Sequence, residues 1–96
     1  MPGLSPQEAE IVRAAVKDAF GGEAVVWLFG SRATGDRRGD VDLYVETPTP
    51  GSLPDRLAAR RRLEDRLQQK VDLIVRGPGE APAAIDAIAK QTGSPL

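Results

Sequence analysis

The first part of the chain has apolar residues at the spacing of a helix. They fall on one face of a helical projection and are Ile11, Val12, Ala15, Val16 and Ala19. Ser5 can cap this helix, Pro6 suits its first turn, and Glu8 completes a capping box. Gly21 and Gly22 then end it. We therefore predict a helix between Ser5 and Gly21 that packs against the rest of the fold.

Two segments after this helix have the pattern of β-strands. Residues 24–29 (AVVWLF) form a continuous apolar run that is too short for a helix, which predicts a strand buried on both faces. Residues 40–46 (DVDLYVE) alternate, so the two aspartates, Tyr44 and Glu46 point away from the face formed by the aliphatic residues. The intervening residues 30–39 are predicted to be a loop, with room for one helical turn after Ser31.

The second half of the chain predicts a helix followed by a strand. Residues 47–54 (TPTPGSLP) cannot continue a strand and predict an exposed connection. Residues 55–69 are helical in composition, with Asp55 near the N-terminus as a cap or dipole partner. The expected apolar face of this helix, which Arg60 interrupts, is formed by Leu57, Leu63 and Leu67. Residues 71–75 (VDLIV) predict the strand.

A last helix over residues 80–91 and a short tail over residues 93–96 complete the expected order of helix, strand, strand, helix, strand and helix. We expect one domain over residues 1–96. Its class is α/β (α+β), with a small mixed sheet of three or four strands packed with helices.

The composition narrows the chemistry. The 96 residues contain no cysteine and no histidine, which excludes thiolate sites and the commonest general base. A bound metal should then be a hard ion held by carboxylate oxygens. The net charge of -1 gives no general attraction to nucleic acid, so we expect no direct nucleic-acid binding. No apolar run approaches the roughly 20 residues of a membrane span, and the N-terminus is not a signal peptide. We predict a cytoplasmic protein.

Asp40 and Asp42 are the first candidate metal ligands. Two positions apart on a strand, their carboxylates project from one face, with backbones about 6 to 7 Å apart. A divalent cation between them would relieve their repulsion, and Mg²⁺ typically binds one or two carboxylates together with substrate phosphates. Taken alone, the pair is more typical of an ordinary acidic strand face.

Asp72 is the third candidate, because a charge within an apolar strand is costly unless it is paired or bound to metal. If its strand lies beside that of Asp40, three carboxylates converge and can hold two metal ions about 3.5 to 4 Å apart. The alternative is an ion pair between Asp72 and an arginine of the preceding helix.

Gly30 and Ser31 follow directly after the first strand. The glycine allows a ligand close to the backbone, and the serine hydroxyl with the following amides can bind phosphate oxygens. Arg32, Arg37 and Arg38 place positive charge on the same loop. A plain turn with solubilising arginines is the alternative.

Together, these features resemble the DNA polymerase beta-like nucleotidyltransferase superfamily. The segments FGSRATG, DVDL and VDLIV are most similar to its minimal nucleotidyltransferases, the MNT proteins of prokaryotes. The resemblance covers nearly the whole chain, to about Ile88, and implies the nucleotidyltransferase fold. In this chain eight residues separate Ser31 from Asp40, about two fewer than the family usually has, and Gly39 stands where many members have serine.

The resemblance implies a role for each candidate residue. Gly30 and Ser31 match the triphosphate-binding turn, with Arg32 beside them. The paired metal ligands match Asp40 and Asp42, and the third carboxylate, which acts on the attacking hydroxyl, matches Asp72. These three aspartates are the expected catalytic and metal-binding residues.

The implied activity is transfer of AMP from ATP to a hydroxyl with the help of Mg²⁺, most simply two ions. The implied partner is a HEPN-family toxin, whose tyrosine would be the acceptor, so the chain would be its antitoxin. Two alternatives remain open. The chain could neutralise a toxin by occlusion without turnover, or it could act on RNA ends or a small molecule.

Overall fold

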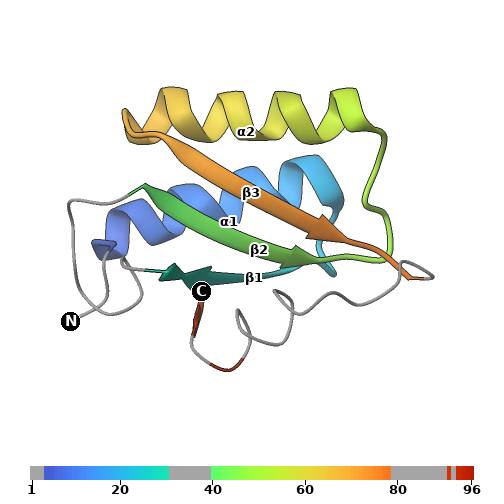
Figure 1. Cartoon of the computed structure of the whole chain (residues 1–96), viewed down its shortest axis with the longest axis horizontal. Coiled ribbons are helices and arrows are strands. Elements are labelled where there is room, and N and C mark those ends of the chain that lie inside the picture. The colour runs from blue at the N-terminus through green and yellow to red at the C-terminus, as the bar shows by residue number, and fades with distance from the viewer. Residues whose placement is uncertain (1–3, 31–39, 79–90, 92) are drawn as a thin grey trace.

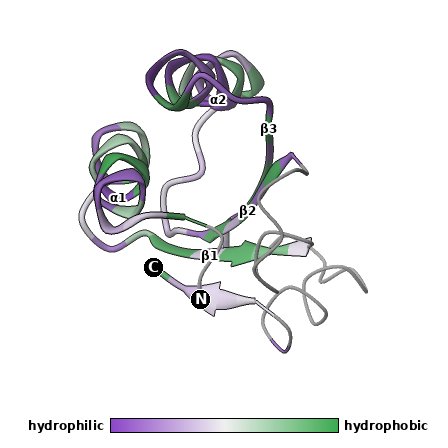
Figure 2. Ribbon diagram, turned by 90° about the vertical axis from the view of Figure 1, so that its left-hand side faces the viewer, coloured by the Kyte–Doolittle hydropathy of each residue, from purple (hydrophilic) through white to green (hydrophobic). Residues whose placement is uncertain are grey.

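Two helices lie against one face of a four-stranded sheet (Figures 1 and 2). The computed structural model describes residues 4–30, 40–78, 91 and 93–96. In chain order the elements are α1 (Pro6–Phe20), β1 (Val25–Phe29), β2 (Val41–Glu46), α2 (Leu53–Leu67), β3 (Val71–Arg76) and β4 (Ser94–Pro95). The predicted α/β class with a small sheet is confirmed. None of the described helices is long and apolar enough to cross a membrane.

The sheet is mixed and has the order β3-β2-β1-β4. β1 pairs antiparallel with β2 and with β4, whereas β2 and β3 are parallel. Parallel neighbours need a crossover connection, and α2 supplies it. The tail predicted over residues 93–96 instead contains β4, where Ser94 pairs with Leu28. The prediction was wrong here because a two-residue strand has no periodicity that a sequence pattern could show.

Helix α1 begins as predicted. Ser5 N–H donates to Glu8 Oε1 at 2.9 Å, and Glu8 N–H donates to Ser5 Oγ at 3.1 Å, which forms the capping box. Its buried residues are Val12, Ala15, Val16 and Phe20. Ala19, predicted on the apolar face, is exposed because it lines an open pocket between α1 and α2.

Helix α2 begins two residues earlier than predicted. Ser52, not Asp55, is the N-cap, and Asp55 is the third helical residue of a second capping box. The buried residues are Ala59, Leu63 and Leu67. Leu57, predicted to be buried with them, is 43% exposed. The buried face of α2 is therefore centred on Ala59, Leu63 and Leu67, and it is narrower than the face predicted from the three leucines.

The connection from β2 to α2 is not wholly exposed, contrary to the prediction. Thr47 is buried, and its hydroxyl donates to the carbonyl oxygen of Phe20 at 3.0 Å. The Thr49 hydroxyl donates to the same oxygen at 2.7 Å. These bonds satisfy a carbonyl at the C-terminus of α1 that has no partner within the helix, and they tie α1 to the end of β2.

The main core lies between the helices and the sheet. The strand residues in it are Val26, Leu28, Val41, Leu43, Val45, Val71 and Val75. The opposite face of the sheet carries a separate apolar cluster, in which the rings of Trp27 and Tyr44 are 5.6 Å apart. The strand of residues 24–29, predicted to be buried on both faces, is buried at Val26, Leu28 and Phe29, whereas Val25 is exposed.

The helix predicted over residues 80–91 lies almost entirely outside the described residues. Gln91, its one described residue, is helical.

Candidate active site

Three acidic residues lie on the face of the sheet opposite to α1 and α2. Alternation along β2 buries Val41 and Leu43 against the helices, so Asp42 points to the other face, as does Asp40 by the same period of two. In β3 the same alternation places Asp72 on that face, between Val71 and Leu73.

The parallel pairing of β2 and β3 brings two of these residues side by side. The register aligns Val41 with Val71 and Asp42 with Asp72. Neighbouring strands lie about 4.8 Å apart, so the two carboxylates are direct neighbours. The condition stated from the sequence, that the strand of Asp72 lies beside the strand of Asp42, is therefore met.

The electrostatics of the site centre on Asp42. Its pKa is raised above the ordinary 3.8 first by burial and then by the negative charges of Asp72 and Asp40. A side-chain hydrogen bond with Asp72 raises the pKa further. Asp42 therefore senses both other carboxylates, and the site favours a proton or a cation at this point.

The three carboxylates do not converge as fully as the sequence suggested. Within residues 4–30 and 40–78, no group of three acidic side chains has the arrangement of a preformed metal site. Asp40, which precedes β2, and Asp72, on the edge strand β3, are both exposed. The prediction that Asp72 is a charge within a buried run was wrong, because the strand order places β3 at the edge of the sheet formed by the described residues and leaves Asp72 exposed. The metal-binding role of the three residues stays a prediction.

Gly30 is required beside these carboxylates for a steric reason. Its φ of 76° is a left-handed conformation that favours glycine. A Cβ at this position would collide with a carboxylate oxygen of Asp42. Asp42 pairs with Phe29, the residue before Gly30, so Gly30 lies directly against the Asp42 side chain. The sequence predicted close approach of a ligand here, and the structure shows close approach of a carboxylate.

The rest of the predicted phosphate-binding loop lies outside the described residues. This applies to Ser31 and Arg32, and also to Arg37 and Arg38. Their roles stay predictions.

Glu64 is a positioning residue that the sequence reasoning missed. Its Oε2 accepts a hydrogen bond from the backbone N–H of Val71 at 3.0 Å. The N–H of Val41 donates to the carbonyl oxygen of Lys70 at 2.9 Å. These bonds fix the start of β3 one residue before Asp72. The only signal in the sequence was a glutamate in the last turn of a helix, a common surface feature.

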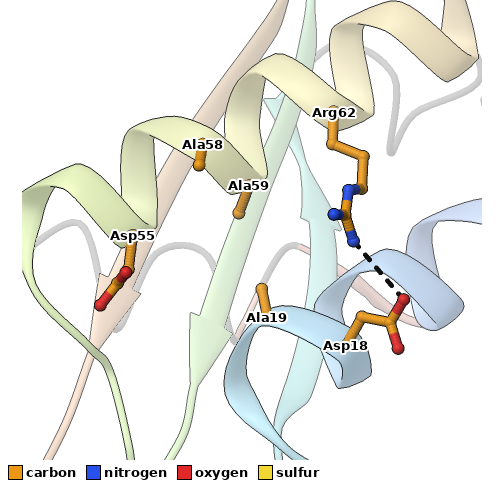
Figure 3. Close-up of a pocket in the computed structure, with 6 residues that line it drawn as sticks. All are labelled: Asp18, Ala19, Asp55, Ala58, Ala59 and Arg62. Carbon is orange, nitrogen blue, oxygen red and sulfur yellow. Dashed lines mark hydrogen bonds and ion pairs between the residues drawn. The ribbon is translucent and has the colours of Figure 1, made fainter.

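A pocket of about 190 Å³ lies between α1 and α2 (Figure 3). An ion pair of 3.5 Å between Arg62 and Asp18 crosses it, and three alanines and Asp55 complete its lining. None of the three candidate aspartates lines this pocket. A second pocket, of about 300 Å³ beside β3, does include Asp72.

Comparison with known proteins agrees with this geometry. The family model described as a nucleotidyltransferase domain matches residues 9–92. No curated protein matches the chain.

Several solved structures have the same fold. A mutant of the MntA-HpeT toxin-antitoxin has a TM-score of 0.77 at 20% identity, covering 97% of this chain and 72% of that one. A toxin-antitoxin with AMP-PNP has a TM-score of 0.75 at 22% identity, and the match covers 92% of this chain and 70% of that one. The structure of a tri-AMPylated Shewanella oneidensis HEPN toxin in complex with MNT antitoxin has a TM-score of 0.69 at 20% identity. The match covers 92% of this chain and 66% of that one. At these identities the likeness establishes the fold.

Proposed function

Because the chain belongs to the nucleotidyltransferase domain family, we propose that it transfers AMP from ATP to a hydroxyl group of a protein partner. The observation that carries this proposal is the in-register pairing of Asp42 with Asp72 on the face of the sheet opposite to α1 and α2, with Asp40 close enough to raise the pKa of Asp42. Acidic groups on adjacent strands, beside a glycine turn, suit the binding of a metal-complexed triphosphate.

The chemistry of the donor atoms at the site suits a divalent cation, although the described residues form no preformed metal geometry. The donors are carboxylate oxygens, the chain has no histidine or cysteine to compete, and mutual repulsion raises the pKa of Asp42. Asp40 and Asp42 would hold one Mg²⁺, and Asp72 would share a second with them. Bound Mg²⁺ would neutralise phosphate charge and lower the pKa of the acceptor hydroxyl.

The chain's own residues would position the reactants. Gly30 accommodates the Asp42 carboxylate against the backbone, and Ser31 and Arg32 would bind the oxygens of the triphosphate. The acceptor oxygen forms a bond to the α-phosphorus while the α–β bridging bond breaks, and pyrophosphate leaves with the electron pair. The acceptor proton passes to Asp72 and from there to solvent. Catalysis would rest on orientation and charge neutralisation.

The partner we propose is a HEPN-family toxin, with a tyrosine as the acceptor. Support comes from the similar fold of an MNT antitoxin in complex with an AMPylated HEPN toxin. In this proposal the chain is an antitoxin that inactivates its toxin covalently, and the cytoplasmic location predicted from its sequence is where both would meet.

A second candidate is an antitoxin that binds its toxin without turnover. The observation that favours it is the short segment of eight residues between Ser31 and Asp40, which limits how fully the phosphates are held. Transfer to RNA has no comparable support, because a net charge of -1 gives no general attraction to nucleic acid.

Label transfer distinguishes these functions. The chain is incubated with Mg²⁺, a candidate HEPN-family partner and ATP labelled at the α-phosphate, or in parallel at the γ-phosphate. We expect only the α-label on the partner, mapped to a tyrosine by mass spectrometry. Asp40→Ala should abolish transfer, whereas Asp65→Ala, an exposed aspartate on α2 outside the site, should not. Absence of label with wild type, or equal labelling by Asp40→Ala, would contradict transfer at this site.

A further inference from the structure

A groove of about 300 Å³ runs between α2 and the free edge of β3 and reaches Asp72. Five consecutive residues of β3, from Asp72 to Arg76, line it. Successive strand residues point to opposite faces, so a pocket lined by all five lies along the strand's edge. In the described part of the chain this edge has no strand beside it, because the sheet order ends at β3.

The helix side of the groove is one surface of α2. It is formed by Leu53, Arg56, Leu57 and Arg60, whose i, i+3, i+4 and i+7 spacing places them on one side of the helix. This side is next to the buried stripe but outside the core. Leu53 is 67% exposed and Leu57 43% exposed. The groove therefore combines a strand edge with two solvent-facing leucines.

The charges that line the groove are mainly positive. Three arginines, Arg56, Arg60 and Arg76, are among the lining residues, together with one acidic residue, Asp72. The Arg60 side chain is 44% exposed, and its Nε is 4.0 Å from the nearest oxygen of Glu64, at the limit of an ion pair. Arg56 Nε donates to the carbonyl oxygen of Pro50 at 3.3 Å, which holds that side chain over the groove. Asp72 lies at the end of this positive lining.

We propose that this groove binds an extended, acidic polypeptide segment of the partner, which adds to the edge of β3 and presents its acceptor hydroxyl at Asp72. Main-chain hydrogen bonds to a strand edge give affinity, and the flanking side chains give specificity. Apolar residues of the segment would contact Leu53 and Leu57, and its acidic residues would face the arginines. The inference rests on the proposed function for the chemistry at Asp72, but the docking itself requires no turnover.

A polypeptide fits this groove better than a nucleic acid. Binding of single-stranded nucleic acid combines a positive groove with aromatic side chains on which bases stack, and no aromatic residue is among those that line this groove. Exposed leucines beside a free strand edge are instead typical of peptide recognition.

A nuclear magnetic resonance titration tests the proposal without ATP or Mg²⁺. The probe is a synthetic peptide of about seven residues, a typical strand length, with alternating glutamate and valine around a central tyrosine. Amide shifts should change over Leu53–Arg60 and Asp72–Arg76. A matched peptide with lysine in place of glutamate, and an oligoadenylate RNA, should bind at least about tenfold more weakly.

Two charge reversals on the same helix provide the matched variants. Arg60→Glu should weaken binding of the acidic peptide at least about tenfold. Arg61→Glu, which does not line the groove, should change it by less than about twofold. The spectra themselves report whether each variant is folded. The proposal is overturned by no shift change, by changes elsewhere, by equal effects of the two variants, or by preference for RNA or the basic peptide.

The outcomes separate this inference from the proposed function. Groove-specific peptide binding without any label transfer from ATP would support the docking surface and contradict the enzymatic activity. Label transfer to a partner that is unaffected by Arg60→Glu would support the activity and contradict the docking surface.

Discussion

Asp42 is the residue at which stability and the proposed function conflict. Its pKa is raised by burial and by two neighbouring carboxylates. For a raised pKa, the folded state without a cation is favoured below the ordinary value of 3.8 and loses stability as the pH rises through the raised value. The site is therefore strained electrostatically at neutral pH until a proton or a cation binds there.

Asp42→Asn should relieve this strain and abolish activity at the same time. We expect the free energy of unfolding at neutral pH, without Mg²⁺, to rise by about 0.2 to 1 kcal/mol, the range of cross-strand side-chain pairs. The gain should vanish near pH 3. Urea unfolding at both pH values measures it, with Asp65→Asn on exposed α2 as the control. A variant that is less stable than wild type at neutral pH would contradict the electrostatic account.

Gly30→Ala should damage the site from the backbone side. The left-handed φ of 76° and the collision of a Cβ with the Asp42 carboxylate together should cost about 1 to 3 kcal/mol. The rate of AMP transfer should fall together with the stability, because the new Cβ would displace the Asp42 carboxylate. Gly22→Ala is the matched control, since a Cβ there meets nothing within 4 Å. Thermal unfolding and label transfer check both effects, and equal stability of the two variants would refute the steric argument.

At the scale of elements, local signals in the sequence predicted most of the fold. Capping residues and apolar spacing predicted α1, and strict alternation predicted β2 with its buried and acidic faces. The predicted start of α2 was two residues too late, because Ser52 and Asp55 both favour the N-terminus of a helix. Only the hydrogen bonds show that Ser52 is the cap. Whether Leu57 is buried depends on how α2 packs against the sheet, and the local spacing of apolar residues does not determine that packing.

Two leucines of α2 test that packing directly. Leu63 is fully buried, whereas Leu57 is 43% exposed. Leu63→Ala should cost about 2 to 5 kcal/mol through the lost contacts and the cavity, and Leu57→Ala less than about 0.5 kcal/mol. Chemical denaturation measures both. Similar losses for the two variants would indicate that α2 packs with the broad face expected from the sequence.

The N-cap of α2 offers a second test at this scale. Ser52→Ala removes a capping box and should cost about 1 kcal/mol, with little effect on AMP transfer because Ser52 is not among the candidate site residues. Ser52→Asp, which can still cap the helix, should retain nearly full stability. Loss of transfer in a folded Ser52→Ala variant would show that this end of α2 contributes to the reaction.

At the scale of the whole molecule, the site depends on a pairing that α2 makes possible. The sequence identified Asp40, Asp42 and Asp72 as candidates. It predicted that they form one site only if the strand of Asp72 lies beside the strand of the other two. The crossover through α2 and the anchoring of Val71 by Glu64 determine the parallel register that aligns Asp42 with Asp72. Long-range register of this kind depends on contacts between distant segments, so local patterns could not predict it.

The central claim is that these three carboxylates support metal-dependent nucleotidyl transfer. Its most direct test is the rate of pyrophosphate release from ATP in the presence of the acceptor, for wild type and for Asp40→Asn, Asp42→Asn and Asp72→Asn. We predict release that requires Mg²⁺, stops with a chelator and falls at least about 100-fold in each folded variant. A wild-type rate in Asp72→Asn, or release that persists without a divalent cation, would contradict the claim.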